Sequence, residues 1–223
     1  MQRTSIETKK NLIEEIKRIY YIRQKEIEKR LNEFEEIWNA GTDGDIFVEL
    51  IFCILTPQSK ALTCSYAVER ICQDKLFLKG NSKQIANGLY DIRFKNKKAM
   101  FIVEARNRFI KDGKISIKSK IGKFGNARTA REWLVQNIKG FGYKEASHFL
   151  RNIGHGEELA ILDRHILKNL ESLGIIKENP KNLQRNKYYE IENLMSDFAR
   201  RIEIPLDHLD LLLWCKETGR IFK

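Results

Sequence analysis

Helix-breaking residues are scarce in this chain, and the spacing of its apolar residues is helical. Only 3 prolines and 13 glycines occur among 223 residues, and apolar residues recur mainly three and four positions apart. Strand-like alternation is nearly absent. The pattern therefore predicts an all-α protein. With 42% hydrophobic residues, the chain can bury a substantial core, either as one compact unit or as two small lobes.

Capping signals and apolar periodicity together predict where the helices begin and end. A first long helix is expected from Ile6 to Trp38, ended by Ala40-Gly41, and Asp43-Gly44-Asp45 is expected to cap the next one. Because proline is tolerated in a first helical turn, Pro57 is expected to open a third helix. Further helices are expected at 82–88, 96–109, 126–137, 143–153, 163–173, 183–201 and 205–217, with a mobile polar stretch at 111–123.

The chain is strongly basic. It has 41 Lys and Arg against 30 Asp and Glu, a formal net charge of +11, which favours a polyanionic partner and salt-dependent binding. Charge alone would also fit RNA or an anionic membrane surface. No stretch approaches the roughly 20 apolar residues of a membrane span, and residues 1–10 lack the apolar core of a signal peptide. We therefore expect a soluble, intracellular protein.

The cysteines and histidines give no sign of a metal site. The cysteines form no close C-x-x-C pair and lie mostly among apolar helical neighbours, so free buried thiols are expected. The histidines share no spacing, with one another or with acidic residues, that is typical of metal ligands. The four cysteines are Cys53, Cys64, Cys72 and Cys215.

A glycine hairpin is the most informative motif. Gly140 and Gly142 follow the apolar Ile138 and lead directly into a helix-forming stretch, so the backbone N–H groups converge where that helix begins. Such a turn is a phosphate cradle, and on a basic chain the phosphate is expected to belong to DNA. Further candidate phosphate contacts are the basic residues Lys120, Lys123, Arg128 and Lys139. In the alternative interpretation, these side chains belong to a solvated charged surface.

Two charged residues near the hairpin can carry chemistry. Lys144 lies in the first turn of the helix after the hairpin, and Asp163 follows 19 residues later. Burial and a positive helix end both favour the neutral amine, which is a nucleophile, and a carboxylate stabilises a carbocation-like sugar. In the alternative interpretation, Lys144 is a solvated side chain and Asp163 only caps the helix that starts at Arg164.

Three segments together resemble a known family. Residues 139–152, residues 55–58 and the terminal residues 218–223 are similar to the archaeal-type 8-oxoguanine DNA glycosylase/AP lyases of the helix-hairpin-helix DNA glycosylase superfamily. The resemblance runs from about residue 45 to the last residue. It implies an all-α, two-lobed fold with the active site between the lobes, which are expected at 1–55 plus 180–223 and at 56–179. The helix-hairpin-helix is expected at 126–153.

The resemblance also implies a chemistry. Lys144 is expected to form a Schiff base with the opened sugar, after which a proton leaves C2′ and the 3′ phosphate is eliminated. Asp163 is expected to stabilise charge on the sugar and to position or deprotonate the attacking amine. The resemblance also implies Gln58 for filling the gap left in the DNA, and Phe101, Trp214 and Lys223 for base recognition. Asp210 lies one helical turn before Trp214 and is expected to face the same base, while Gly140, Gly142, Lys139 and Arg128 are expected to bind phosphate.

Each of these implied residues also has an ordinary interpretation. Aromatic residues at helical spacing usually belong to a core, charged residues on an amphipathic helix are usually solvated, and a terminal lysine is usually frayed. A glutamine early in a helix can equally be an exposed polar residue without a role in binding.

The implied substrate is double-stranded DNA containing 8-oxoguanine, bound by a monomer of prokaryotic, nucleoid-associated type without a required cofactor. Hairpin carbonyls are expected to bind a monovalent cation, as in relatives. No iron–sulfur cluster is expected, because only Cys215 lies near the C-terminus. Two alternatives stay open: a non-catalytic helix-hairpin-helix module in which Lys144 contacts phosphate, and a glycosylase/lyase for another oxidised base.

Overall fold

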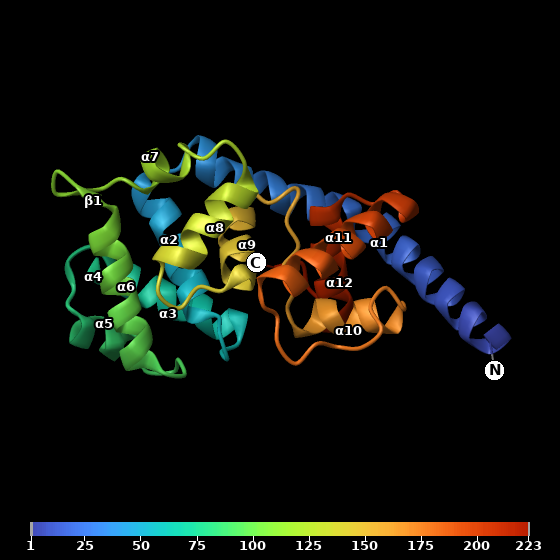
Figure 1. Cartoon of the computed structure of the whole chain (residues 1–223). Coiled ribbons are helices and arrows are strands. Elements are labelled where there is room, and N and C mark those ends of the chain that lie inside the picture. The colour runs from blue at the N-terminus through green and yellow to red at the C-terminus, as the bar shows by residue number, and fades with distance from the viewer. Residues whose placement is uncertain (1, 223) are drawn as a thin grey trace. The chain divides into compact units, whose positions relative to one another are not determined.

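The computed structural model describes residues 2–222, with side chains for residue 7 and residues 9–222. This part of the chain is mostly helical, which confirms the expected fold class, with one pair of two-residue strands (Figure 1). The elements in order are α1 (Gln2–Asn39), α2 (Asp43–Leu55), α3 (Ala61–Gln73), α4 (Leu76–Lys79), α5 (Ser82–Gly88), α6 (Lys95–Phe109), β1 (Ile110–Lys111), β2 (Lys114–Ile115), α7 (Ile117–Ile121), α8 (Ala127–Asn137), α9 (Tyr143–Asn152), α10 (Arg164–Ser172), α11 (Arg185–Ile202) and α12 (Leu206–Thr218).

Two compact units make up the chain. The hairpin unit is Phe34–His155, and the terminal unit is Met1–Glu33 together with Gly156–Lys223. The hairpin unit therefore contains α2 to α9, and the terminal unit contains most of α1 with α10, α11 and α12.

Helix α2 is the centre of the hairpin unit. It packs against α3, α6, α7 and α9 (Figure 1). The segment from Glu49 to Leu55 is buried without interruption. A helix buried all round needs its polar groups paired, and the Glu49 carboxylate accepts a hydrogen bond of 2.9 Å from Asn152 of α9. The cap of α2 differs from the expected one. Thr42 is the N-cap, and it exchanges hydrogen bonds with Asp45 in a capping box.

Pro57 does not open a helix, contrary to the sequence-based expectation. Residues 56–59 form a turn in which the N–H of Ser59 donates to the carbonyl of Thr56 at 3.0 Å, and α3 begins only at Ala61. The reason is visible in the backbone. Gln58 has φ of 56°, in the left-handed region, which no residue of a right-handed α-helix can adopt.

The polar stretch at 111–123, which was not predicted to form regular structure, contains the second strand of a pair and a short helix. β1 pairs antiparallel with β2 through Ile110↔Ile115 and Lys111↔Lys114, and α7 follows. The two buried isoleucines of α7, Ile117 and Ile121, fix this segment against the core. Four-residue periodicity was present here, but the surrounding lysines masked it.

The terminal unit is built around α12, which packs on α10 and α11. Its core is apolar and includes Tyr188, Met195 and Leu212. The irregular segment 159–162, which precedes α10, is buried throughout. This segment leads directly to Asp163, the N-cap of α10.

Candidate active site

The hairpin at 138–142 joins α8 to α9, as the sequence predicted. Gly140 has φ of +88°, and a Cβ at this position would lie 2.7 Å from Cδ2 of Phe101. Both the backbone conformation and the contact with Phe101 therefore require glycine. Gly142 differs, since its φ is −103° and it serves as the N-cap of α9. A left-handed backbone therefore requires glycine at position 140 but not at position 142.

The helices on either side of the hairpin are joined by polar contacts. Tyr143 donates its hydroxyl to the Glu132 carboxylate at 3.0 Å, and the buried Arg131 donates to the Ser147 hydroxyl at 3.0 Å. The N–H of Gly142 donates to Oε2 of Glu145 at 3.0 Å. A carboxylate near a helix N-terminus is stabilised by the helix dipole, so the hairpin position that could hold an anion contacts the protein's own carboxylate.

Lys144 lies in the first turn of α9 with 23% of its side chain exposed. Its Nζ is 3.4 Å from Oγ1 of Thr56 and 3.9 Å from Oε1 of Glu145. The Thr56 hydroxyl donates to the Cys53 carbonyl at 3.0 Å, which leaves its oxygen as the acceptor for Lys144. Both contacts of the amine are long, so Lys144 is positioned without being tightly hydrogen-bonded.

A cysteine near Lys144 is the obvious competing nucleophile. Cys64 of α3 is fully buried, and this burial raises the pKa of its thiol to about 11, although the nearby Lys98 and Lys144 ammonium groups act in the opposite direction. At neutral pH the thiol is therefore protonated, and it is the thiolate that reacts. Among the residues of this region, the amine of Lys144 is the better candidate.

A buried lysine without a distinctive sequence motif organises the turn beside Lys144. Lys98 of α6 is 5% exposed, and its Nζ donates to the carbonyls of Leu55 and Pro57, each at 2.7 Å, and to the Ser59 hydroxyl at 3.1 Å. These three acceptors match the three N–H groups of an ammonium. Burial lowers the pKa of Lys98. The sequence signal was its helical spacing with the apolar Ile102.

Gln58 lies at the tip of this turn, with an exposed side chain and the left-handed φ of 56°. Such a conformation costs on the order of 1 kcal/mol for a residue with a Cβ, and it is retained where the surroundings impose it. Lys98 imposes it here, because it fixes the residues on both sides, Pro57 and Ser59. The use of Gln58 to fill a gap in DNA stays a prediction.

Asp163 of the terminal unit is the N-cap of α10. Its Oδ1 accepts hydrogen bonds from the N–H groups of His165 at 2.7 Å and Ile166 at 2.9 Å. Within residues 2–222, Oδ2 has no hydrogen-bond partner. One oxygen therefore holds the helix start, while the other is available to a substrate. The capping interpretation is confirmed, and it does not exclude the catalytic one.

The segment before Asp163 is held rigidly by side chains. The N–H of Ala160 donates to Glu192 at 2.9 Å, and that of Ile161 donates to Oδ1 of Asp210 at 3.0 Å. The hydroxyl of Tyr188 donates to the Ala160 carbonyl at 2.7 Å. These bonds satisfy the backbone of a buried irregular segment, and they fix where α10 begins.

The residues predicted to recognise the base fall into both units. Asp210 is 3% exposed and supports the backbone at Ile161, while Trp214 is half-buried and stacks on Phe222 with ring centroids 6.4 Å apart. Phe101 packs on Gly140 of the hairpin. Lys223 lies outside the described residues. Base recognition by these four residues stays a prediction.

The predicted phosphate contacts all lie in the hairpin unit. Lys139 is exposed and pairs with Glu104 at 3.0 Å, and Arg128 is half-buried in the first turn of α8. The structure therefore brings the hairpin glycines, Lys139 and Lys144 into one short segment. Their contact with DNA stays a prediction.

Neither a metal-binding cluster nor a membrane-spanning helix occurs in the described part of the chain. Over residues 2–222, no three His, Cys, Asp or Glu side chains come together in a way that could hold a metal ion. Cys53, Cys64 and Cys215 are buried thiols, and Cys72 is a partly buried one. Over the same residues, no helix combines the length and the apolar character needed to cross a membrane.

The chain is similar to characterised proteins over nearly its whole length. A family model described as 8-oxoguanine DNA glycosylase matches residues 27–204. The 8-oxoguanine DNA glycosylase/AP lyase of Fusobacterium nucleatum is 48% identical over 215 residues, covering 96% of this chain and 99% of the relative.

Solved structures agree with this sequence similarity. The crystal structure of the Methanocaldococcus jannaschii 8-oxoguanine DNA glycosylase matches with a TM-score of 0.85 at 40% identity, covering 95% of this chain and 96% of that one. The glycosylase/lyase of the same organism, crystallised with a 15mer DNA containing 8-oxoguanine, matches with a TM-score of 0.84 at 38% identity, covering 93% and 99%. The chain therefore belongs to the archaeal-type 8-oxoguanine DNA glycosylase/AP lyases of the helix-hairpin-helix family.

Proposed function

We propose that this protein excises 8-oxoguanine from double-stranded DNA and then cleaves the abasic site by β-elimination through a Schiff base on Lys144. The observation that carries the proposal is the environment of Lys144. Its amine lies at the start of a helix that follows a glycine hairpin, and its two contacts are long, at 3.4 and 3.9 Å. The relative from Methanocaldococcus jannaschii, crystallised with DNA containing 8-oxoguanine, supports the substrate.

The proposed reaction begins at the N-glycosidic bond. As this bond breaks, its electron pair leaves with the base, and positive charge develops on the sugar. The lone pair of Lys144 Nζ attacks C1′ and the amine loses a proton. The C1′–O4′ bond then breaks, O4′ takes up a proton, and the nitrogen lone pair forms the C1′=N bond of the imine, which is the Schiff base. The imine withdraws electrons, so a proton leaves C2′ and the C3′–O3′ bond breaks with departure of the phosphate. Water hydrolyses the final imine and restores the amine.

Asp163 is proposed to supply the negative charge that this reaction needs. Its Oδ1 is already committed to the two backbone N–H groups of α10, which anchors the carboxylate. Its Oδ2 is left to interact with the developing positive charge or with the proton that the amine loses. A preoriented charge of this kind costs no reorganisation during the reaction.

The other proposed roles concern the DNA. Extruding a base from the stack costs a few kcal/mol and leaves a gap, which the exposed Gln58 is proposed to fill. The flipped base needs apolar faces and hydrogen-bond partners, proposed to come from Phe101, Trp214, Asp210 and Lys223. Gly140, Gly142, Lys139 and Arg128 are proposed to contact phosphates. We infer that the protein acts as a monomer in the cell interior and requires no cofactor for this reaction. The backbone carbonyls of the hairpin are proposed to bind a monovalent cation.

Borohydride trapping tests the central step, because borohydride reduces a Schiff base to a stable amine and so links the protein to DNA covalently. We expect an adduct when the wild-type protein meets a duplex containing 8-oxoguanine, and none with Lys144→Gln. Lys83→Gln, which alters an exposed lysine of α5, is the matched control and should give the wild-type yield.

Two results would contradict the proposal. Absence of an adduct with wild type would favour a non-catalytic DNA-binding module, and an equal adduct with Lys144→Gln would assign the chemistry to another amine. A panel of duplexes with different lesions, run with the same trap, tests the substrate. Faster trapping on another oxidised base than on 8-oxoguanine would replace the proposed specificity.

A further inference from the structure

A second basic region lies in the hairpin unit, away from Lys144. It is an open cavity of about 310 Å³ at the ends of α6 and α8, next to β1 and α7. Four cationic side chains and two hydroxyl groups line it, namely Arg108, Lys111, Lys120, Lys123, Ser116 and Ser119. Of the described residues that line this cavity, none is an aspartate or glutamate. The cavity therefore concentrates positive charge without a neutralising carboxylate.

Two of the four cations are held in place by uncharged partners. Arg108 donates to Oδ1 of Asn137 at 3.0 Å, and the amide nitrogen of Asn137 donates to the Trp133 carbonyl at 2.9 Å, which fixes the orientation of the amide. Lys120 Nζ lies 4.7 Å from the centroid of the Trp133 ring. These interactions position the two side chains but leave their charges uncompensated.

The other two cations, Lys111 and Lys123, are exposed, and within residues 2–222 neither has an ion-pair partner. Like charges gathered around one cavity repel each other, so an anion placed among them would remove an unfavourable interaction. Lysine ammonium groups, an arginine fork and serine hydroxyls are also the donors that phosphate oxygens accept from.

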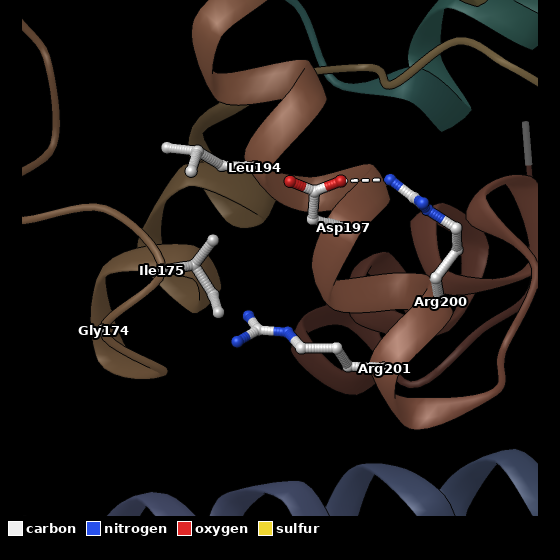
Figure 2. Close-up of a pocket in the computed structure, with 6 residues that line it drawn as sticks. All are labelled: Gly174, Ile175, Leu194, Asp197, Arg200 and Arg201. Atoms are coloured by element: carbon white, nitrogen blue, oxygen red, sulfur yellow. Dashed lines mark hydrogen bonds and ion pairs between the residues drawn. The ribbon is translucent and has the colours of Figure 1, made fainter.

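A cavity in the terminal unit shows that arginines alone do not make such a site. This cavity, of about 590 Å³, is lined by Arg200 and Arg201, but Asp197 lies among them and pairs with Arg200 (Figure 2). Gly174 and the apolar side chains of Ile175 and Leu194 complete the lining. The charge of this second cavity is partly neutralised, and no described residue that lines it has a hydroxyl group. We therefore do not propose a phosphate site there.

We propose that the cavity at Arg108, Lys111, Lys120 and Lys123 binds a phosphate group. Its position favours a phosphodiester of the DNA backbone, because Asn137 is the last residue of α8 and the hairpin begins at the next residue. The hairpin and the cavity would then hold the same DNA at two points. The DNA assignment rests on the proposed function, whereas the phosphate site itself does not.

The test removes the two exposed charges in Lys111→Gln/Lys123→Gln. Both side chains are exposed, so the substitutions leave the packed core unchanged. The matched control is Lys75→Gln/Lys83→Gln, which removes the same charge from exposed positions of the same unit outside the cavity. Affinity for an 8-oxoguanine duplex is measured over a series of KCl concentrations, together with single-turnover excision at saturating enzyme.

We expect the cavity variant to bind DNA about tenfold more weakly at low salt than the control. Its plot of log affinity against log salt should be shallower by about 0.9 for each phosphate that the protein no longer neutralises. Excision at saturation should stay within about twofold of the control, since neither Lys144 nor Asp163 is among the described residues that line the cavity. Equal affinity and equal salt slope in the two variants would overturn the assignment to DNA.

A second measurement separates the two sources of phosphate. The indole N–H signal of Trp133, assigned with Trp133→Phe, is followed by NMR during titration with inorganic phosphate and, separately, with an undamaged duplex. A response to the duplex supports a backbone phosphodiester, and a response to inorganic phosphate alone supports a free phosphate ligand. No response to either probe overturns the phosphate site.

Failure of this inference is distinguishable from failure of the proposed function. If the wild-type protein excises 8-oxoguanine while Trp133 responds to neither probe, only the cavity assignment is wrong. If Trp133 responds to DNA while no excision or borohydride adduct is seen, the proposed chemistry is wrong and the cavity assignment stands.

Discussion

Two lysines contact the same short segment, residues 55–59, in opposite ways. Lys98 is buried and donates three hydrogen bonds of 2.7 to 3.1 Å to it, two of them to backbone carbonyls. Lys144 is partly exposed and makes one contact of 3.4 Å to the hydroxyl of Thr56. One amine is saturated with acceptors, and the other has donor capacity left.

This difference separates a structural role from a chemical one. An ammonium group whose three N–H groups all have acceptors stabilises the segment it binds. Removing it leaves buried carbonyls without a hydrogen-bond donor. An amine with loose contacts can exchange them for a substrate at little cost. Like Lys144, Asp163 has hydrogen-bonding capacity left for a substrate, because one of its carboxylate oxygens accepts two hydrogen bonds and the other accepts none from the described residues. Changes at Lys98 should therefore alter stability, and changes at Lys144 or Asp163 should alter rate.

The largest expected effect tests the rate side of this comparison. In Asp163→Asn the amide oxygen can still accept the two N–H bonds of α10, because asparagine is a good N-cap, but the negative charge is lost. We expect base excision to fall by a factor of about 100 to 1,000, the range typical of losing a preoriented stabilising group. Single-turnover excision of 8-oxoguanine measures this loss.

The stability of the Asp163 variants provides the control. The free energy of unfolding of Asp163→Asn should lie within about 0.5 kcal/mol of the wild-type value. That of Asp163→Ala should be lower by about another 1 kcal/mol, because alanine cannot cap the helix. Excision by Asp163→Asn at the wild-type rate would show that the unpaired oxygen has no chemical role.

The next effect tests the stability side. Lys98→Met keeps much of the side-chain volume but leaves the carbonyls of Leu55 and Pro57 without their donor. We expect the free energy of unfolding to fall by about 3 kcal/mol, as typical for buried acceptors left unpaired. Urea denaturation measures this, with Lys83→Met as the control for removing an exposed lysine. A variant as stable as the control would refute the structural role of Lys98.

The smallest expected effect concerns the residue that Lys98 holds in a left-handed conformation. Gln58→Gly relieves the backbone strain, while the greater freedom of glycine in the unfolded chain offsets that gain, so stability should change by less than about 1 kcal/mol. Excision should nevertheless drop several-fold, because the side chain that fills the gap is missing. Single-turnover rates on lesion-containing duplexes measure it.

A conservative variant sharpens the Gln58 experiment. Gln58→Asn tolerates the left-handed conformation and keeps an amide on a shorter side chain. An excision rate between those of wild type and Gln58→Gly would show that gap filling depends on the length of the side chain. Equal excision by wild type, Gln58→Asn and Gln58→Gly would assign Gln58 to the turn alone.

Most helices could be predicted from the sequence because their signals are local. The helix expected at 82–88 is observed at Ser82–Gly88, and that expected at 96–109 is observed at Lys95–Phe109. Apolar spacing and nearby caps were sufficient in these cases. The same local signals failed at Pro57, where the backbone is held by Lys98, a residue 41 positions away in the chain.

The sequence by itself determined the helical class, the hairpin glycines and the candidates Lys144 and Asp163, because each depends on residues close together in the chain. Only the tertiary structure decided that Gly140 is required by Phe101, that Lys98 orders the turn at Gln58, and that four cations meet around one cavity. These features arise where distant segments pack together. Sequence spacing carries no information about which polar atoms meet there, since burial and pairing are set by the completed fold.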